Sequence, residues 1–135
     1  MKILVINGHP DPESFCQAIF QTIVETIDSG RHELEVINLN EEDFDPVLRY
    51  GYRKRMEEDS FILRSQELIK WADHFIFVYP IWWSSMPSLM KGWIDRIFTP
   101  GIAYSANDQG SFIWNYLRGK QFKKLLKGKT ASIYA

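Results

Sequence analysis

The chain has 135 residues, of which 45% are hydrophobic and 24% charged, so its length and composition suit one domain with a single core. A formal net charge of −1 excludes an overall field that would collect nucleic acid or an anionic membrane. The single cysteine, Cys16, excludes an intramolecular disulfide and favours the reducing cytoplasm, and the N-terminal run "ILVI" is too short for a membrane span.

The first third of the sequence predicts a strand, a helix and a second strand. Residues 3–6 are a continuous apolar run that ends at Asn7, which is typical of a strand buried on both faces. Apolar residues then recur at helical spacing over residues 15–27, and Ser14 is a candidate N-cap. Residues 34–39 alternate between apolar and polar, which predicts a strand near the edge of a sheet.

The rest of the chain continues the alternation of helix and strand. A charged loop over residues 41–58 leads into a helix over 62–71 and a strand over 74–80. A further helix starts at Pro87, because the first turn of a helix tolerates proline, and its apolar stripe stops before Pro100. We interpret residues 107–119 as irregular, 120–127 as a short amphipathic turn and 129–135 as a fourth strand.

This order of elements predicts an α/β fold with an open, mostly parallel sheet and right-handed crossovers. In the doubly wound order 2-1-3-4-5 the fourth strand lies inside the sheet, and the sequence stops within that strand at Ala135. An apolar edge would then be left unpaired. We therefore expect residues 1–135 to form a single domain that is shortened at its C-terminus, or one whose edge a partner covers.

The connection "NGHPDPESF" between the first strand and the first helix is one candidate site. Ligands of open α/β sheets bind beyond the carboxyl ends of the strands, where the strand order reverses. The free N–H groups and the positive dipole of the helix start, with His9 and Ser14 as further donors, suit a phosphate. No GxGxxG or GxxxxGK[ST] motif is present, which argues against a dinucleotide fingerprint and a P-loop. A capped helix start with a surface histidine explains the loop equally well.

The stretch "VYPIWWSSMPSLMKGWIDRIFTPG" is the second candidate site. Pro80 keeps Tyr79 extended, so the chain runs straight up to the turn that follows. Ile81, Trp82 and Trp83 would then present backbone groups and a flat wall to a planar ligand. With a 2-1-3 strand order this wall faces the same crevice as the first loop. The alternative is that both tryptophans pack under the following helix as core residues.

Other residues with functional chemistry give weaker signals. Cys16 lies at a helix start, where a thiol can be reactive, but a lone cysteine is usually a small hydrophobic residue. His32 and His74 have no second ligand at metal spacing, and no HExxH or CxxC motif exists, so no metal site is expected. We interpret the lysines between 120 and 129 as a solvated face rather than a phosphate-attracting patch.

Three segments carry a resemblance to a known family. In this order and spacing, "NGHPDPESF", "YPIWWSSMPSLMKGWIDRIFTPGIAY" and "LLKGKTASIYA" resemble the NAD(P)H dehydrogenase (quinone) family of flavodoxin-like flavoproteins. The likeness covers essentially the whole chain, and its second motif is highly specific. It implies a flavodoxin-like, doubly wound parallel sheet in a three-layer α/β/α arrangement. The family includes quinone reductases, drug-activity modulators and ancillary subunits of potassium-efflux systems.

The resemblance also implies a cofactor, its binding residues and a homodimer. The cofactor is FMN or FAD, and NAD(P)H is the co-substrate. His9, Ser14, Phe15 and Cys16 match the loop that binds the flavin phosphate, with Cys16 at a place where relatives often carry Asn. Tyr104 matches an aromatic residue near the nicotinamide and quinone pocket, which a second subunit completes in relatives. The loop that lies along the isoalloxazine ring matches Pro80, Ile81, Trp82, Trp83 and Ser84.

The implied reaction passes a hydride from NAD(P)H through flavin N5 to a quinone-like acceptor. Relatives continue, after the fourth strand, with a Thr-Thr-Gly-Gly-like loop that contacts the ring, and then with a Tyr and a His implicated in hydride transfer. The sequence ends before all of these, so we expect the last strand and helix to be absent and the catalytic residues to lie beyond Ala135. The alternative is a non-catalytic or regulatory flavodoxin-like protein, such as an ancillary subunit of a membrane transport system.

Overall fold

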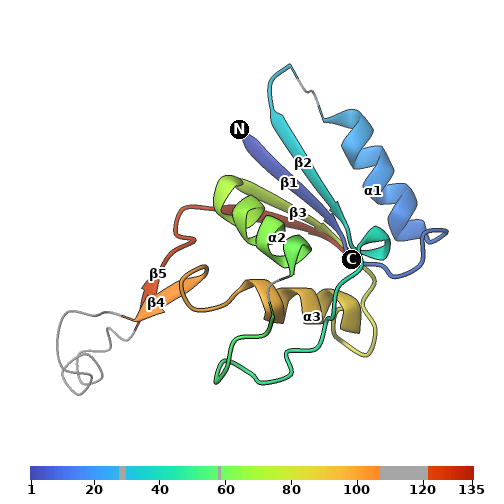
Figure 1. Cartoon of the computed structure of the whole chain (residues 1–135). Coiled ribbons are helices and arrows are strands. Elements are labelled where there is room, and N and C mark those ends of the chain that lie inside the picture. The colour runs from blue at the N-terminus through green and yellow to red at the C-terminus, as the bar shows by residue number, and fades with distance from the viewer. Residues whose placement is uncertain (28–29, 58, 107–121) are drawn as a thin grey trace.

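A computed structural model describes residues 1–27, 30–57, 59–106 and 122–135 (Figure 1). Within these ranges one sheet has the strand order β2-β1-β3-β6, and every neighbouring pair in it is parallel. The predicted strand order is therefore confirmed, with the second strand at an edge. The four strands are β1 (Lys2–Asn7), β2 (Glu33–Asn38), β3 (His74–Val78) and β6 (Thr130–Tyr134).

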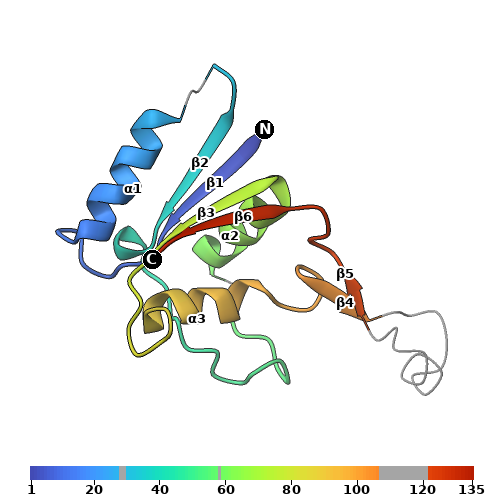
Figure 2. The same cartoon turned by 180° about the vertical axis from the view of Figure 1, so that it is seen from behind.

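Helices cover both faces of this sheet, as the three-layer prediction requires. The helix α1 (Phe15–Thr26) lies on one face, whereas α2 (Ser60–Trp71) and α3 (Ser88–Ile97) lie on the other (Figures 1 and 2). The strand β1 shows why both faces need cover, because successive side chains of a strand point to opposite faces. Ile3 and Val5 join the cluster beneath α1. The intervening residues Leu4 and Ile6 join the larger cluster beneath α2 and α3.

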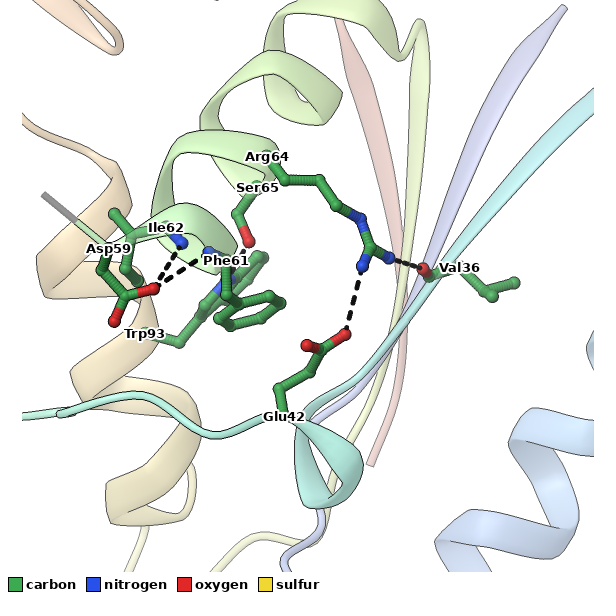
Figure 3. A network of polar contacts seen from close by, with 8 residues as sticks. All are labelled: Val36, Glu42, Asp59, Phe61, Ile62, Arg64, Ser65 and Trp93. Atoms are coloured by element: carbon green, nitrogen blue, oxygen red, sulfur yellow. Dashed lines mark hydrogen bonds and ion pairs between the residues drawn. The ribbon is translucent and has the colours of Figure 1, made fainter.

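The ends of α1 and α2 follow from their capping groups. The Ser14 Oγ atom accepts the Gln17 N–H at 3.2 Å, so the predicted cap of α1 is confirmed. The helix α2 starts two residues earlier than predicted. One carboxylate oxygen of Asp59 accepts the N–H groups of Phe61 and Ile62 at 2.9 and 3.2 Å, which begins the helix at Ser60 (Figure 3).

Polar contacts attach α2 to its neighbours. The indole of Trp93 is fully buried, and its Nε1–H donates to Ser65 Oγ at 3.1 Å, which joins α3 to α2 (Figure 3). On the other side of α2, the Arg64 guanidinium lies 3.4 Å from a carboxylate oxygen of Glu42 and 3.5 Å from the carbonyl oxygen of Val36 in β2. These contacts hold α2 between the sheet and α3.

One segment of the C-terminal third departs from the prediction, whereas the predicted fourth strand is present as β6. Part of the expected amphipathic turn over residues 120–127 is instead the strand β5 (Phe122–Lys124), which pairs antiparallel with β4 (Tyr104–Ala106) in a separate two-stranded sheet. Three-residue strands are too short for a periodic signal, because alternation needs at least four residues to show. The predicted irregular segment 107–119 lies outside the described residues.

The strand β6 starts at Thr130 and keeps exposed apolar side chains at Ile133 and Tyr134. Just before it, Lys129 donates from Nζ to the carbonyl oxygen of Lys70 at 2.8 Å and to that of Ala72, so a lysine stabilises the carboxyl end of α2. No helix in the described part of the chain has the length and apolar character needed to cross a membrane.

Candidate functional site

The parallel strands all finish at one edge of the sheet, with their last residues in register. Asn7 lies opposite both Asn38 and Val78, and Val78 lies opposite Tyr134. In both overall views this edge lies beside the starts of α1 and α3 (Figures 1 and 2). The Gly8 N–H donates to the Val78 carbonyl at 2.8 Å, so the β1–α1 loop leaves the sheet attached to β3. Both predicted ligand loops therefore start at the same edge.

Side chains also join these two loops. The His9 ring meets the Trp82 ring at a centroid distance of 5.4 Å and an interplanar angle of 78°, an edge-to-face contact. The Nδ1 atom of His9 accepts the N–H of Asp11 at 2.9 Å. Because Nδ1 acts as the acceptor, the ring proton belongs on Nε2, and a neutral His9 presents an N–H donor.

The tryptophan stretch forms a tight turn. Trp82 and Ser85 exchange both of their backbone hydrogen bonds, at 2.8 and 3.0 Å. The two central residues, Trp83 and Ser84, have φ angles of 51° and 61°, a left-handed pair typical of the type I′ turn. Asn and Gly usually occupy such positions, so this turn holds two side chains in a strained backbone.

The turn decides between the two interpretations of the tryptophan pair. The side chain of Trp83 is 101% exposed, and that of Trp82 is 46% exposed. The alternative that both pack under the following helix is therefore wrong for Trp83, and Trp82 is only partly covered. Ile81, beside them, is also exposed. The structure leaves a free aromatic surface next to His9.

The start of α1 adds hydrogen-bond donors to this edge. The first N–H groups of a helix have no intrahelical acceptor, which leaves those of Phe15 and Cys16 at the helix start. The Ser14 hydroxyl accepts from Gln17, and its own hydrogen stays available to a ligand. Phe15 is 80% exposed, which leaves an apolar side chain open to solvent at the helix start. These donors and the helix dipole suit an anion.

Cys16 and Tyr104 behave differently from the other candidates. Burial raises the pKa of the Cys16 thiol, so at neutral pH the side chain is a thiol that packs with the cluster beneath α1.

The strand β4, which begins at Tyr104, lies away from the start of α1 in both views (Figures 1 and 2). Within one chain, Tyr104 is therefore not brought to the His9–Trp82 contact.

A set of amide side chains that was not predicted from the sequence lies beneath the β1–α1 loop. Asn7, Gln17 and Asn38 are buried, and Asn40 is half-buried. All four bond to one another or to the backbone of His9. A signal was present, because β1 and β2 both end in the triplet "VIN" and a parallel register brings Asn7 opposite Asn38.

Other features lie away from this edge. Two open pockets, of about 630 and 480 Å³, are lined in part by the segment 43–57, and their shared walls carry charges of both signs from Lys54, Glu57 and Arg96. Neither pocket is lined by His9 or by the tryptophan turn. Among the residues that the structure describes, no group of three or more His, Cys, Asp or Glu side chains could hold a metal ion.

Comparison with known proteins places the fold. A family model described as a flavodoxin-like fold matches residues 1–134. The crystal structure of Smu.1420 from Streptococcus mutans UA159 is 34% identical, with a TM-score of 0.77 over 98% of this chain and 66% of that one.

Two curated relatives align over almost the whole chain. The ribosyldihydronicotinamide dehydrogenase-like protein traD of Penicillium crustosum is 29% identical over 98% of this chain and 56% of its own length. The ribosyldihydronicotinamide dehydrogenase [quinone] of Mus musculus is 28% identical over 98% of this chain and 66% of its own length. The chain thus spans less than two thirds of the length of these relatives.

Proposed function

The chain belongs to the flavodoxin-like fold family, and from that premise we propose that it is the flavin-binding part of an oxidoreductase. The proposed reaction takes a hydride from NAD(P)H and reduces a quinone-like acceptor. The observation that carries the proposal is the contact between His9 and Trp82, which sets a donor-rich helix start beside an exposed aromatic surface. The mouse relative is named for a quinone, which supports the choice of acceptor.

The donor set at the start of α1 fits the phosphate of a flavin. The His9 Nε2–H, the Ser14 hydroxyl and the N–H groups of Phe15 and Cys16 would hold that phosphate. Binding through backbone N–H groups does not depend on the identity of the side chain, so Cys16 is compatible with this role. We propose FMN as the cofactor, since these donors account for one phosphate group.

The exposed aromatic surface fits the flat ring of a flavin. Trp82 and Trp83 would lie along the ring, and the backbone from Pro80 to Ser84 would meet its polar edge. The two backbone hydrogen bonds between Trp82 and Ser85 hold the turn, and with it this surface, in the absence of a ligand. A bound flavin supplies the hydride chemistry itself, and the residues of this chain bind it, orient it and shield one of its sides from water.

We further propose that the chain acts as a homodimer in the cytoplasm. Apolar side chains at Val47, Tyr50, Tyr52 and Leu63 are exposed on and beside the segment 43–57, which supports a second copy as the covering partner. Since β4, which begins at Tyr104, lies away from the start of α1 in its own chain, Tyr104 would serve the site of the other copy. The cytoplasm is supported by the free thiol of the single cysteine.

Titration of the purified full-length gene product with FMN, followed by fluorescence quenching, tests the proposal. We expect saturable FMN binding, and NADH or NADPH oxidation that requires both FMN and a soluble quinone. A chain that binds no flavin overturns the proposal. Flavin binding without any NAD(P)H oxidation contradicts the enzymatic part and favours the non-catalytic alternative. Sedimentation at micromolar concentration tests the dimer, and a monomer contradicts that part.

A further inference from the structure

The amide side chains beneath the β1–α1 loop hold the backbone of His9 from two sides. The Asn7 Oδ1 atom accepts the His9 N–H at 3.1 Å, and the Asn40 Nδ2 group donates to the His9 carbonyl at 3.2 Å. Gln17, from α1, joins the two asparagines, because its Oε1 atom accepts from Asn7 at 2.7 Å and from Asn40 at 3.2 Å. Three different elements of the fold thus meet at one loop residue.

The backbone N–H of His9 can only donate and its carbonyl can only accept. These two roles determine how each amide in the network is oriented. A backbone N–H only donates, so Asn7 must offer His9 its oxygen and direct its NH₂ group away from the loop. That NH₂ group needs acceptors, and it meets the oxygens of Gln17 and Asn38 at 2.7 and 3.0 Å. Asn38 then donates to a carboxylate oxygen of Glu41 at 2.7 Å.

The same reasoning assigns a single role to Asn40. Its NH₂ group faces two atoms that only accept, the His9 carbonyl oxygen and the Gln17 Oε1 atom. Exchanging its oxygen and nitrogen would set oxygen against oxygen on both sides. In the network, Asn40 is therefore a donor and Gln17 is an acceptor. The Asn40 Oδ1 atom is buried and has no partner among the described residues.

We propose that Asn40 is a positioning residue that acts through the His9 backbone to hold the His9 ring against Trp82 with its proton on Nε2. With both backbone groups of His9 held, the ring stays where Nδ1 accepts the Asp11 N–H and where it packs nearly perpendicular to the Trp82 ring. The consequence for ligand binding rests on the proposed function, in which the Nε2–H of His9 contacts the flavin phosphate.

The opposite roles of Asn40 and Gln17 supply a matched pair of variants. Asn40→Asp and Gln17→Glu make the same change, from amide to carboxylate, and add the same charge beside the same loop. Asn40→Asp removes the donors and sets a carboxylate against the His9 carbonyl. Gln17→Glu keeps an oxygen at the position that accepts from Asn7 and Asn40. A Ser65→Ala variant, which removes a buried hydrogen bond far from the loop, controls for lost stability.

Nuclear magnetic resonance of the His9 ring in the flavin-free chain tests the positioning role directly. In the wild type we expect the neutral Nε2–H tautomer and a ring-current displacement of the His9 protons, which Trp82→Leu removes. Asn40→Asp loses the displacement and shows mixed tautomers. Gln17→Glu and Ser65→Ala keep both signatures. Wild-type signatures in Asn40→Asp, or their equal loss in Gln17→Glu, would overturn the proposal.

A comparison of FMN with riboflavin, which lacks the phosphate, tests the consequence for binding. We expect the preference for FMN over riboflavin to fall about tenfold in Asn40→Asp relative to Gln17→Glu, the effect of one hydrogen bond to a charged group. Equal preferences in the two variants contradict the link to the phosphate. If the wild type binds neither compound, the proposed function fails, while the resonance experiment still decides the role of Asn40.

Discussion

The imidazole of His9 stands nearly perpendicular to the indole of Trp82, at a centroid distance of 5.4 Å, and this contact joins two loops that the sequence separates widely. His9 follows β1 and Trp82 follows β3, which are neighbouring strands in the sheet. A substitution of His9 or Trp82 therefore removes a contact of the other loop as well. The contact is the geometric reason for treating the two loops as one site.

Substitution of the exposed Trp83 should weaken FMN binding and leave the stability of the fold nearly unchanged. Because Trp83 makes no buried contacts, Trp83→Ala should change the free energy of unfolding by less than about 0.5 kcal/mol in urea denaturation. FMN affinity should fall about tenfold, through loss of ring packing. Glu67→Ala, at an exposed side chain of α2, should leave FMN affinity as it is. Unchanged affinity in Trp83→Ala would remove Trp83 from the site.

The left-handed turn predicts a stabilising substitution. Ser84 has a φ of 61°, which glycine adopts without strain, so Ser84→Gly should raise the free energy of unfolding by about 0.5 to 1 kcal/mol. The neighbouring Ser85 has no positive φ, and Ser85→Gly should lower stability slightly, through the greater entropy of the unfolded chain. Thermal unfolding of the two variants checks the contrast. A loss of stability in Ser84→Gly would contradict the strain.

Gly8 lets the β1–α1 loop approach α3. A Cβ atom at Gly8 would overlap the buried side chain of Met90 at Sδ, so Gly8→Ala should destabilise the fold by about 1 to 3 kcal/mol. Met90→Ala alone should cost about 2 to 5 kcal/mol, because it leaves a cavity. The double variant should cost less than the sum by about 1 kcal/mol or more, as measured in urea. Additive costs would show that the two residues do not meet.

Asp45 predicts a dependence of stability on pH. Its carboxylate accepts the Val47 N–H at 2.9 Å and the Arg49 Nε–H at 2.6 Å, and these bonds, in that order, hold the pKa of Asp45 below its usual range. A lowered folded-state pKa gives stabilisation that is complete above the unfolded-state pKa and is lost as the pH falls through the folded-state value.

Asp45→Asn should therefore lower the urea midpoint at neutral pH, and its difference from the wild type should shrink below about pH 4. The measurement is the urea midpoint of both proteins across the acid range. A difference of the same size at every pH would mean that the ionised carboxylate of Asp45 contributes nothing.

Much of the fold was predictable because its signals are local. The uninterrupted run from Ile3 to Ile6 indicated a strand with two buried faces, and its residues do alternate between the clusters on the two sides of the sheet. Ser14 was recognisable as a cap because a hydroxyl before an apolar periodic run has one common use. The pairing of β4 with β5 was not predictable, because neither three-residue strand carries a pattern of its own.

Less of the candidate site was predictable, because exposure depends on turn geometry. The pair Trp82 and Trp83 gave equal support to a ligand wall and to core packing. Only the left-handed turn at Trp83 and Ser84 turns the second indole outward, and these residue types do not signal such a turn. The amide network was missed because its members come from β1, α1, the last residue of β2 and the short 3-10 helix η1 (Leu39–Glu41).

The residue pattern was enough to predict the four strands of the parallel sheet, the three α-helices, the order of the strands and the two loops at the carboxyl edge. These properties follow from hydrophobic periodicity, capping residues and the rules of chain connection, all of which act along the chain. The tertiary structure alone decided that His9 touches Trp82, that Trp83 faces solvent and that Asn40 reaches the His9 carbonyl. Such contacts depend on strand register and backbone dihedral angles, which place residues together in space regardless of their separation in sequence.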